Sequence, residues 1–231
     1  MGQGTDDGAA VLESPQHGNR GNRSEANLPR GPLGPTIAVT RESGARGATI
    51  ARRVGRKLGW DVYTREHLEF LAGNDTQREA IVREAPPTAK AWLDKQAKRL
   101  KGAGVTLFED RPDPVFELIL TLAANGNLIF VGRGAGYLLP RKTTLHVRIV
   151  APLENRIGYM AQHLRLGTAE AELQVRRRDE ARLDFLASHC NHPAGELCDY
   201  DLVLNSAELG EELAAELVVT ALKAKQKRFA E

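Results

Sequence analysis

Residues 41–49, with the sequence RESGARGAT, have the composition and the setting of an anion-binding turn. They follow the apolar run Thr36–Thr40 and lead into an amphipathic segment with helical spacing. A turn of this kind exposes successive backbone N–H groups at the positive end of a helix dipole, where phosphate is the most common ligand. The strict phosphate loop, G-x-x-x-x-G-K-[ST], has a lysine where this chain has Gly47. The spacing therefore leaves two interpretations open, a phosphate site and a plain strand-to-helix turn.

Three arginines form a second candidate feature. Arg133 stands between two glycines, directly after the apolar run Leu128–Val131. Ligands of open α/β sheets bind at the carboxyl ends of such strands. Arg178 and Arg182 are four residues apart, so they share one face of a helix. Because a planar guanidinium can hold phosphate through two hydrogen bonds, this pattern favours anion binding, with structural ion pairs as the alternative.

A group of histidines and cysteines near the C-terminus has residue types that zinc prefers. It consists of His189, Cys190 and His192, followed by Cys198. The spacing matches no regular zinc motif, and nothing else in the chain completes a set of four ligands. We therefore expect a loop there and predict no metal-ligating residues.

Short apolar runs alternate with longer amphipathic segments along most of the chain, a pattern typical of βαβ units around a parallel sheet. The sequence predicts helices over 48–58 and about 209–227, and strands over 36–40, 60–63, 128–131, 145–150 and 201–205. It therefore predicts an α/β fold.

Two segments depart from this alternation. Residues 1–35 contain seven glycines and four prolines, so we predict a disordered tail followed by one domain over 36–231. Residues 65 to about 125 are predicted to form a helical insertion. Its basic residues fit either a solvated helix face or a lid that presents charge to an anionic substrate: Arg78, Arg83, Lys90, Lys95, Lys98, Arg99 and Lys101.

The overall composition narrows the class of partner. The chain has 231 residues, of which 42% are apolar and 27% charged, as in ordinary globular proteins. Lysines and arginines number 32 against 30 acidic residues, too even a balance for DNA wrapping or an electrostatic membrane anchor. Aromatic residues make up only 5%, which argues against stacking on single-stranded nucleic acid. With two cysteines and no long apolar window, we expect a cytoplasmic protein without nucleic-acid or membrane partners.

Several stretches, in order along the chain, resemble the cytidylate kinase-like family. Residues 41–51 are similar to its modified phosphate loop, R-x-x-G-S-G-G-R-x-I-A. Residues 131–134 resemble its V-G-R-G, and residues 151–157 resemble its A-P-L-E-x-R-I. The similarity also covers 57–59, Tyr63, 179–182 and 199–206, the last like Y-D-L-x-x-N-T.

The resemblance implies a P-loop nucleoside-monophosphate-kinase-like fold, with the phosphate loop at the edge of a parallel sheet, a helical acceptor-binding insertion and a lid at about 160–185. It implies transfer of phosphate from ATP to a nucleoside monophosphate such as CMP, with Mg²⁺ held by Thr49 and the nucleotide. The resemblance places ATP on Ser43, Gly44, Ala45, Gly47, Ala48, Thr49 and Arg156. It assigns catalysis to Arg178 and Arg182 and the acceptor phosphate to Arg133. From the residues themselves we add Arg46 to the catalytic residues and Arg41 to the acceptor-binding ones.

Some positions depart from the family pattern. Cytidylate kinases have G-R-D where this chain has Gly132-Arg133-Gly134, and the family often has Asp where Thr64 follows Tyr63. The loop lysine is absent, and Arg46 is the cation placed to replace it. Two other interpretations therefore stay open: a nucleotide-binding or regulatory protein with weak turnover, and a kinase of a small non-nucleotide metabolite.

Overall fold

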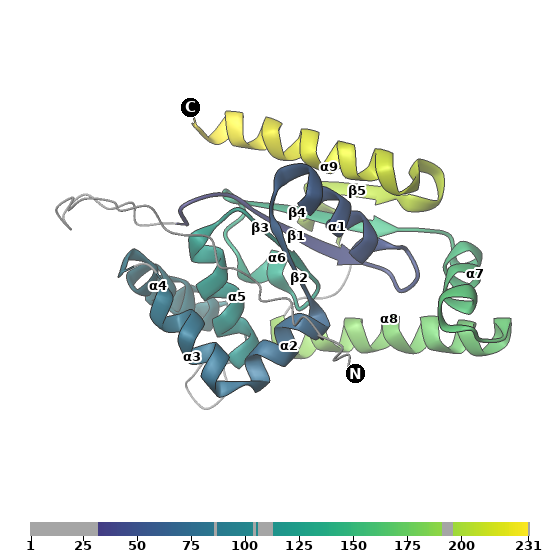
Figure 1. Cartoon of the computed structure of the whole chain (residues 1–231), viewed down its shortest axis with the longest axis horizontal. Helices are drawn as coiled ribbons and strands as arrows, with labels where there is room; N and C mark the ends of the chain where they lie inside the picture. The colour runs from purple at the N-terminus through teal and green to yellow at the C-terminus, as the bar shows by residue number, and fades with distance from the viewer. Residues whose placement is uncertain (1–31, 86, 104, 106–112, 191–195, 231) are drawn as a thin grey trace, which may run out of the picture.

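A parallel β-sheet forms the centre of the molecule (Figure 1). The computed structural model describes residues 32–85, 87–103, 105, 113–190 and 196–230. Within that part, five strands lie in the order β2-β3-β1-β4-β5, all parallel. The strands are β1 Thr36–Arg41, β2 Asp61–Thr64, β3 Leu128–Val131, β4 Thr144–Val150 and β5 Leu202–Asn205. The α/β prediction is confirmed, with every strand boundary within one residue of its predicted place.

Helices cover both faces of the sheet, because the side chains of β1 alternate between them. Ile37 and Val39 pack against α1 (Gly47–Leu58) and α9 (Ser206–Ala230), whereas Ala38 faces the helices on the other side. In α1, apolar residues at helical spacing meet the sheet, and Gly59 ends the helix in the left-handed conformation with φ 67°. The helix α9 begins earlier than predicted and is interrupted at Gly210, where φ is 67°.

Among its described residues, the segment between β2 and β3, where the insertion was predicted, forms four helices. They are α2 Arg65–Gly73, α3 Asp75–Glu84, α4 Pro87–Gly102 and α5 Pro114–Asn125. Polar residues begin three of them: the side chains of Thr64, Asn74 and Asp113 accept hydrogen bonds from first-turn N–H groups. Their apolar faces enclose a core that includes Leu68 and Phe116, both fully buried.

A helical hairpin follows β4. It consists of α7 Leu153–Leu164 and α8 Thr168–Cys190, with α8 running along the side of the sheet opposite α9 (Figure 1). Ile157 and Met160 of α7 pack on Ala171 and Val175 of α8 in a small cluster of their own. The C-terminal end of α8 instead joins the main core on the insertion side.

Two short elements complete the described chain, the helix α6 Ala135–Leu138 and the 3-10 turn η2 Leu197–Asp199. Cys190 ends α8 and is buried, and burial raises the pKa of its thiol to about 12. Cys198 is exposed, and residues 191–195 lie outside the described chain. Within the described residues, no group of three or more histidine, cysteine or acidic side chains could hold a metal ion.

The predicted tail lies mostly outside the described residues, which begin at residue 32. Residues 32–35, which lie before the predicted boundary, bond to the folded part. The N–H of Leu33 donates to the carbonyl of Ala124, and the N–H of Asn127 donates to the carbonyl of Pro35.

Among the helices of the described chain, none combines the length and apolar content needed to cross a bilayer.

Candidate functional site

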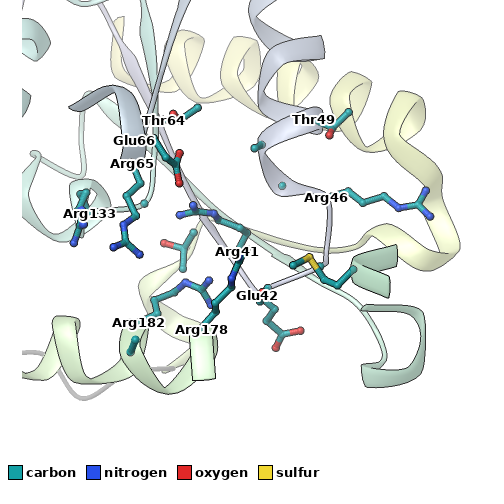
Figure 2. Close-up of a pocket in the computed structure, with 18 of the residues that line it drawn as sticks. Arg41, Glu42, Arg46, Thr49, Thr64, Arg65, Glu66, Arg133, Arg178 and Arg182 are labelled. Carbon is teal, nitrogen blue, oxygen red and sulfur yellow. The ribbon is translucent and has the colours of Figure 1, made fainter. Parts of the chain in front are cut away.

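A cavity of about 520 Å³ lies at the carboxyl ends of β1, β2 and β3, facing the α7–α8 hairpin (Figure 2). Its volume is in the usual range for small-molecule sites. Among the described residues, seven arginines and two glutamates line it. They are Arg41, Arg46, Arg52, Arg65, Arg133, Arg178, Arg182, Glu42 and Glu66. Because β1 is the central strand, the predicted phosphate loop lies at the carboxyl edge of the sheet rather than on an outer strand.

The loop after β1 forms one wall of the cavity. Gly44 has φ 83°, and a Cβ built there would lie 2.5 Å from the carbonyl oxygen of Arg156, so only glycine allows the loop to pack against α7. Gly47, Ala48 and Thr49, the first residues of α1, line the cavity. Residues 47–50 include no acidic side chain, so the positive end of the helix dipole faces the cavity without a local counter-charge.

Gly47 is buried against Arg41, which gives a steric reason for the missing lysine. A Cβ built at Gly47 lies 2.5 Å from the Cβ of Arg41 and 2.9 Å from its Cγ. The side chain of Arg41 then passes over Gly132, where a Cβ would collide with its guanidinium. Two glycines on different elements therefore make room for this one arginine.

Four of the arginines gather at the far side of the cavity from α1: Arg65, Arg133, Arg178 and Arg182 (Figure 2). The guanidinium of Arg41, whose stem packs on Gly47, extends toward them. Burial, followed by the charge of Arg182, lowers the pKa of Arg41 to about 10. Burial and the charge of Arg65 likewise lower the pKa of Arg133 to about 10. Both remain protonated at neutral pH, so the cluster concentrates positive charge. A bound anion would reduce the repulsion among these arginines.

Two glutamates of α2 balance part of this charge. Glu69 pairs with Arg133 and also lies 3.2 Å from Nε of Arg65. Burial would raise the pKa of Glu66, but hydrogen bonds from its own N–H and from Thr64, together with Arg41 and Arg65, lower it below its ordinary value. The glutamates thus hold the arginines apart and in place.

Arg133 combines the two roles that the sequence left open. It lines the cavity and also pairs with a carboxylate, and its guanidinium lies 4.7 Å above the ring of Phe185. Its backbone is left-handed, with φ 56°, which turns the chain from β3 into α6. Its side chain is 14% exposed.

Arg46 points away from the other arginines (Figure 2). Its guanidinium lies 3.7 Å from a carboxylate oxygen of Glu211 on α9 and 4.9 Å above the ring of Tyr159 on α7. The side chain is 45% exposed, at the rim of the cavity. The prediction that Arg46 replaces the loop lysine is untested by this arrangement and would need the side chain to turn.

Two predicted nucleotide-binding residues are not placed to contact a ligand in the cavity. Arg156 lies beneath the loop, where it donates to Asp179 at 2.5 Å, to the carbonyl of Ala151 at 3.0 Å and to that of Ser43 at 3.3 Å. Ala45 is fully buried, and its N–H donates to the carbonyl of Glu42. In this structure both residues support the loop from behind, and their predicted contacts with ATP stay predictions.

Sequence reasoning missed Arg65 and Glu66, which enter the cavity from the first turn of α2. The available signal was their position directly after the strand β2, where ligands of parallel sheets bind. It also missed Tyr159, Phe185 and Arg52. Of the basic residues predicted on the insertion, none that the structure describes lines the cavity, so they do not present charge to a ligand there.

Comparisons with known proteins agree with this geometry. A protein-family model described as the cytidylate kinase-like family matches residues 36–221. A protein named cytidylate kinase from Ignicoccus hospitalis is 22% identical over 182 residues, which cover 79% of this chain and 95% of that protein.

Two solved structures are similar to the chain at low identity, and the first of them shares its fold. A crystal structure of an uncharacterized protein from Eubacterium ventriosum has a TM-score of 0.57 at 15% identity, covering 82% of this chain and 98% of that one. Shikimate kinase from Acinetobacter baumannii has a TM-score of 0.42 at 13% identity, covering 85% and 95%. On the family match, which spans the sheet, the loop and the arginine-lined cavity, the chain belongs to the cytidylate kinase-like family.

Proposed function

We propose that the chain transfers the γ-phosphate of ATP to a nucleoside monophosphate of the CMP type. The observation that carries the proposal is the charge of one cavity: seven arginines against two glutamates, at the carboxyl ends of parallel strands and beside the start of α1. Phosphoryl transfer needs little covalent help from a protein and depends on positioning and on positive charge around the phosphate oxygens.

The proposal assigns the two substrates to different parts of the cavity. The N–H groups at the start of α1 suit the phosphates of ATP, as in other phosphate loops. Arg41, Arg65 and Arg133, on the other side, suit the phosphate of an acceptor. Arg178 and Arg182 come from α8 and reach into the cavity, where they can neutralise the group in transfer.

Magnesium fits the oxygen donors of this site. Mg²⁺ in kinases keeps several waters and binds one or two protein oxygens together with substrate phosphates, so it requires no cage of carboxylates. Thr49, in the first turn of α1, lines the cavity and would supply the protein oxygen. When bound, the ion would neutralise charge on the phosphates of ATP.

The test is a panel of CMP, UMP, AMP and GMP with ATP and magnesium, followed by ADP production. We expect ADP with at least one acceptor and the highest rate with CMP. Arg182→Ala should lower the rate about a hundredfold or more. Arg176→Ala is the matched control, because Arg176 is an exposed residue of the same helix that pairs with Glu172. No ADP above the acceptor-free background would refute a nucleoside monophosphate as acceptor.

A second function is favoured by the position of Arg46. With Gly47 packed on Arg41 and Arg46 paired with Glu211, the start of α1 has no side-chain cation aimed at bound phosphates. A nucleotide-binding protein with weak turnover would have this arrangement. ATP binding by calorimetry, without transfer to any of the four acceptors, would favour it over the kinase.

A further inference from the structure

Asp179 of α8 joins three parts of the site through one carboxylate. Its Oδ1 accepts from the backbone N–H of Ser43 at 2.8 Å and from Nη1 of Arg182 at 2.6 Å. Its Oδ2 accepts from Nη1 of Arg156, on α7, at 2.5 Å. Ser43 and Arg182 line the cavity, and the carboxylate holds both of them. One side chain therefore connects the phosphate loop, the lid arginine and the first turn of α7.

The place of Asp179 along α8 gives this contact its importance. The N-terminal half of α8 packs only into the small cluster with α7, through Ala171 and Val175, among the residues that the structure describes. Leu186 and Cys190, nearer the C-terminus, are part of the main core. Asp179 lies between the two regions, where the hairpin meets the body of the fold. Its bonds therefore set how α8, and the arginines on it, lie against the loop.

We propose that Asp179 is a positioning residue that fixes Arg182 against the phosphate loop, so that the remaining guanidinium donors of Arg182 face the bound phosphate. The inference rests on the proposed function, since it takes a phosphate as the ligand. An arginine side chain loses considerable rotamer entropy when it is immobilised. A carboxylate that already holds the guanidinium removes that cost from the binding step, which strengthens binding without adding a contact to the ligand.

The negative charge of Asp179 would by itself weaken phosphate binding, whereas its hold on Arg182 would strengthen it. The direction in which a variant changes the affinity therefore tests the proposal. A carboxylate near an anion site repels the anion, so if charge alone mattered, Asp179→Asn would tighten phosphate binding. The structure favours positioning because Arg156, whose side chain is 12% exposed, already balances this carboxylate. In Asp179→Asn, the lost hold on Arg182 should therefore lower the affinity for phosphate by more than the lost repulsion raises it.

The experiment measures the dissociation constant of inorganic pyrophosphate by calorimetry on the full chain. We expect Asp179→Asn to weaken binding about tenfold, part of the strength of a charge-assisted hydrogen bond. Glu172→Gln is the matched control: it removes an exposed ion pair of the same helix, with Arg176, and should leave binding within about twofold. Unchanged or tighter binding by Asp179→Asn would overturn the proposal.

Two further variants separate positioning from charge and from folding. Asp179→Glu keeps the charge but displaces the carboxylate, so it should also weaken binding, whereas a pure charge role predicts no change. In an Arg182→Ala background, Asp179→Asn should have no additional effect, because Asp179 acts through Arg182. An equal effect in that background would overturn the inference. If the wild type binds neither pyrophosphate nor ATP, the proposed function itself fails, and this inference fails with it.

Discussion

Replacing Gly47 with alanine tests whether the loop has room for a side chain where other phosphate loops carry lysine. A Cβ at this position would lie 2.5 Å from the Cβ of Arg41, an atom fixed by the strand β1 and not the end of a flexible chain. Forcing extra atoms into such a packed site costs about 1–3 kcal/mol. The higher helix propensity of alanine, compared with glycine, offsets about 0.5–1 kcal/mol of this loss in the free energy of unfolding. We therefore expect a net loss of roughly 1–2 kcal/mol in the free energy of unfolding.

Thermal melting is the assay. For a domain of this size, each kcal/mol shifts Tm by about 2–4 °C, so Gly47→Ala should melt about 2–8 °C below the wild type. Gly158→Ala is the matched control. Gly158 lies within α7, and a Cβ built there meets no described atom within 4 Å beyond its own surroundings in the helix. That variant should gain about 0.5–1 kcal/mol. If Gly47→Ala melts at or above the wild-type temperature, position 47 has room and the steric account of the missing lysine is refuted.

Three other predictions concern Arg133, His146 and Gly44. Arg133→Ala should weaken CMP binding about 10- to 100-fold by calorimetry, with little change in Tm, because Glu69 keeps Arg65 as a partner. Burial lowers the pKa of His146 to about 4 from 6.5, so the unfolded chain takes up a proton that the folded chain excludes as pH falls between these values. The free energy of unfolding, measured in urea, should fall by about 1 kcal/mol for each unit by which the pH drops in this window. His146→Gln should remove this pH dependence, and the control His163→Gln, at an exposed position, should keep it. Gly44→Ala places a Cβ against the backbone of Arg156 at φ 83° and should cost more than about 2 kcal/mol in chemical unfolding; a smaller loss would mean that the loop can lift off α7.

The inner strands β1, β3 and β4 could be predicted from the sequence because each contains a mostly apolar run, as a strand buried on both faces of a parallel sheet must. For the same reason, Leu128–Val131 was placed without error. The interruption of α9 at Gly210 could not be predicted, since a single glycine within a helical pattern is usually tolerated. The bonds of Leu33 and Pro35 could not be predicted either, because their partners, Ala124 and Asn127, are remote in sequence.

Assigning the arginines was harder, because residue type and spacing do not say which way a charged side chain turns. Arg182 and Arg156 are both bound to Asp179, yet only Arg182 also borders the cavity. The difference depends on how α7 and α8 lie against the loop. Tertiary packing, and not the local sequence, sets that arrangement. Arg65 was missed for a related reason: its neighbours in sequence point to a helix start, and only the short strand β2 brings it to the cavity.

Two of the loop's departures from the strict phosphate-loop pattern have one structural cause. In that alignment Arg41 stands at the opening glycine and Gly47 at the lysine. Arg41 fills the space into which a side chain at position 47 would start, and its guanidinium continues over Gly132 into the cavity. A lysine at 47 would therefore require glycine at 41, because the nearest atom to a side chain at 47 is the Cβ of Arg41 itself. Compared with the strict pattern, the chain therefore lacks a cation at position 47, the start of α1, and has one at Arg41, the end of β1. The positive charge thus lies toward the side of the cavity that holds Arg65 and Arg133.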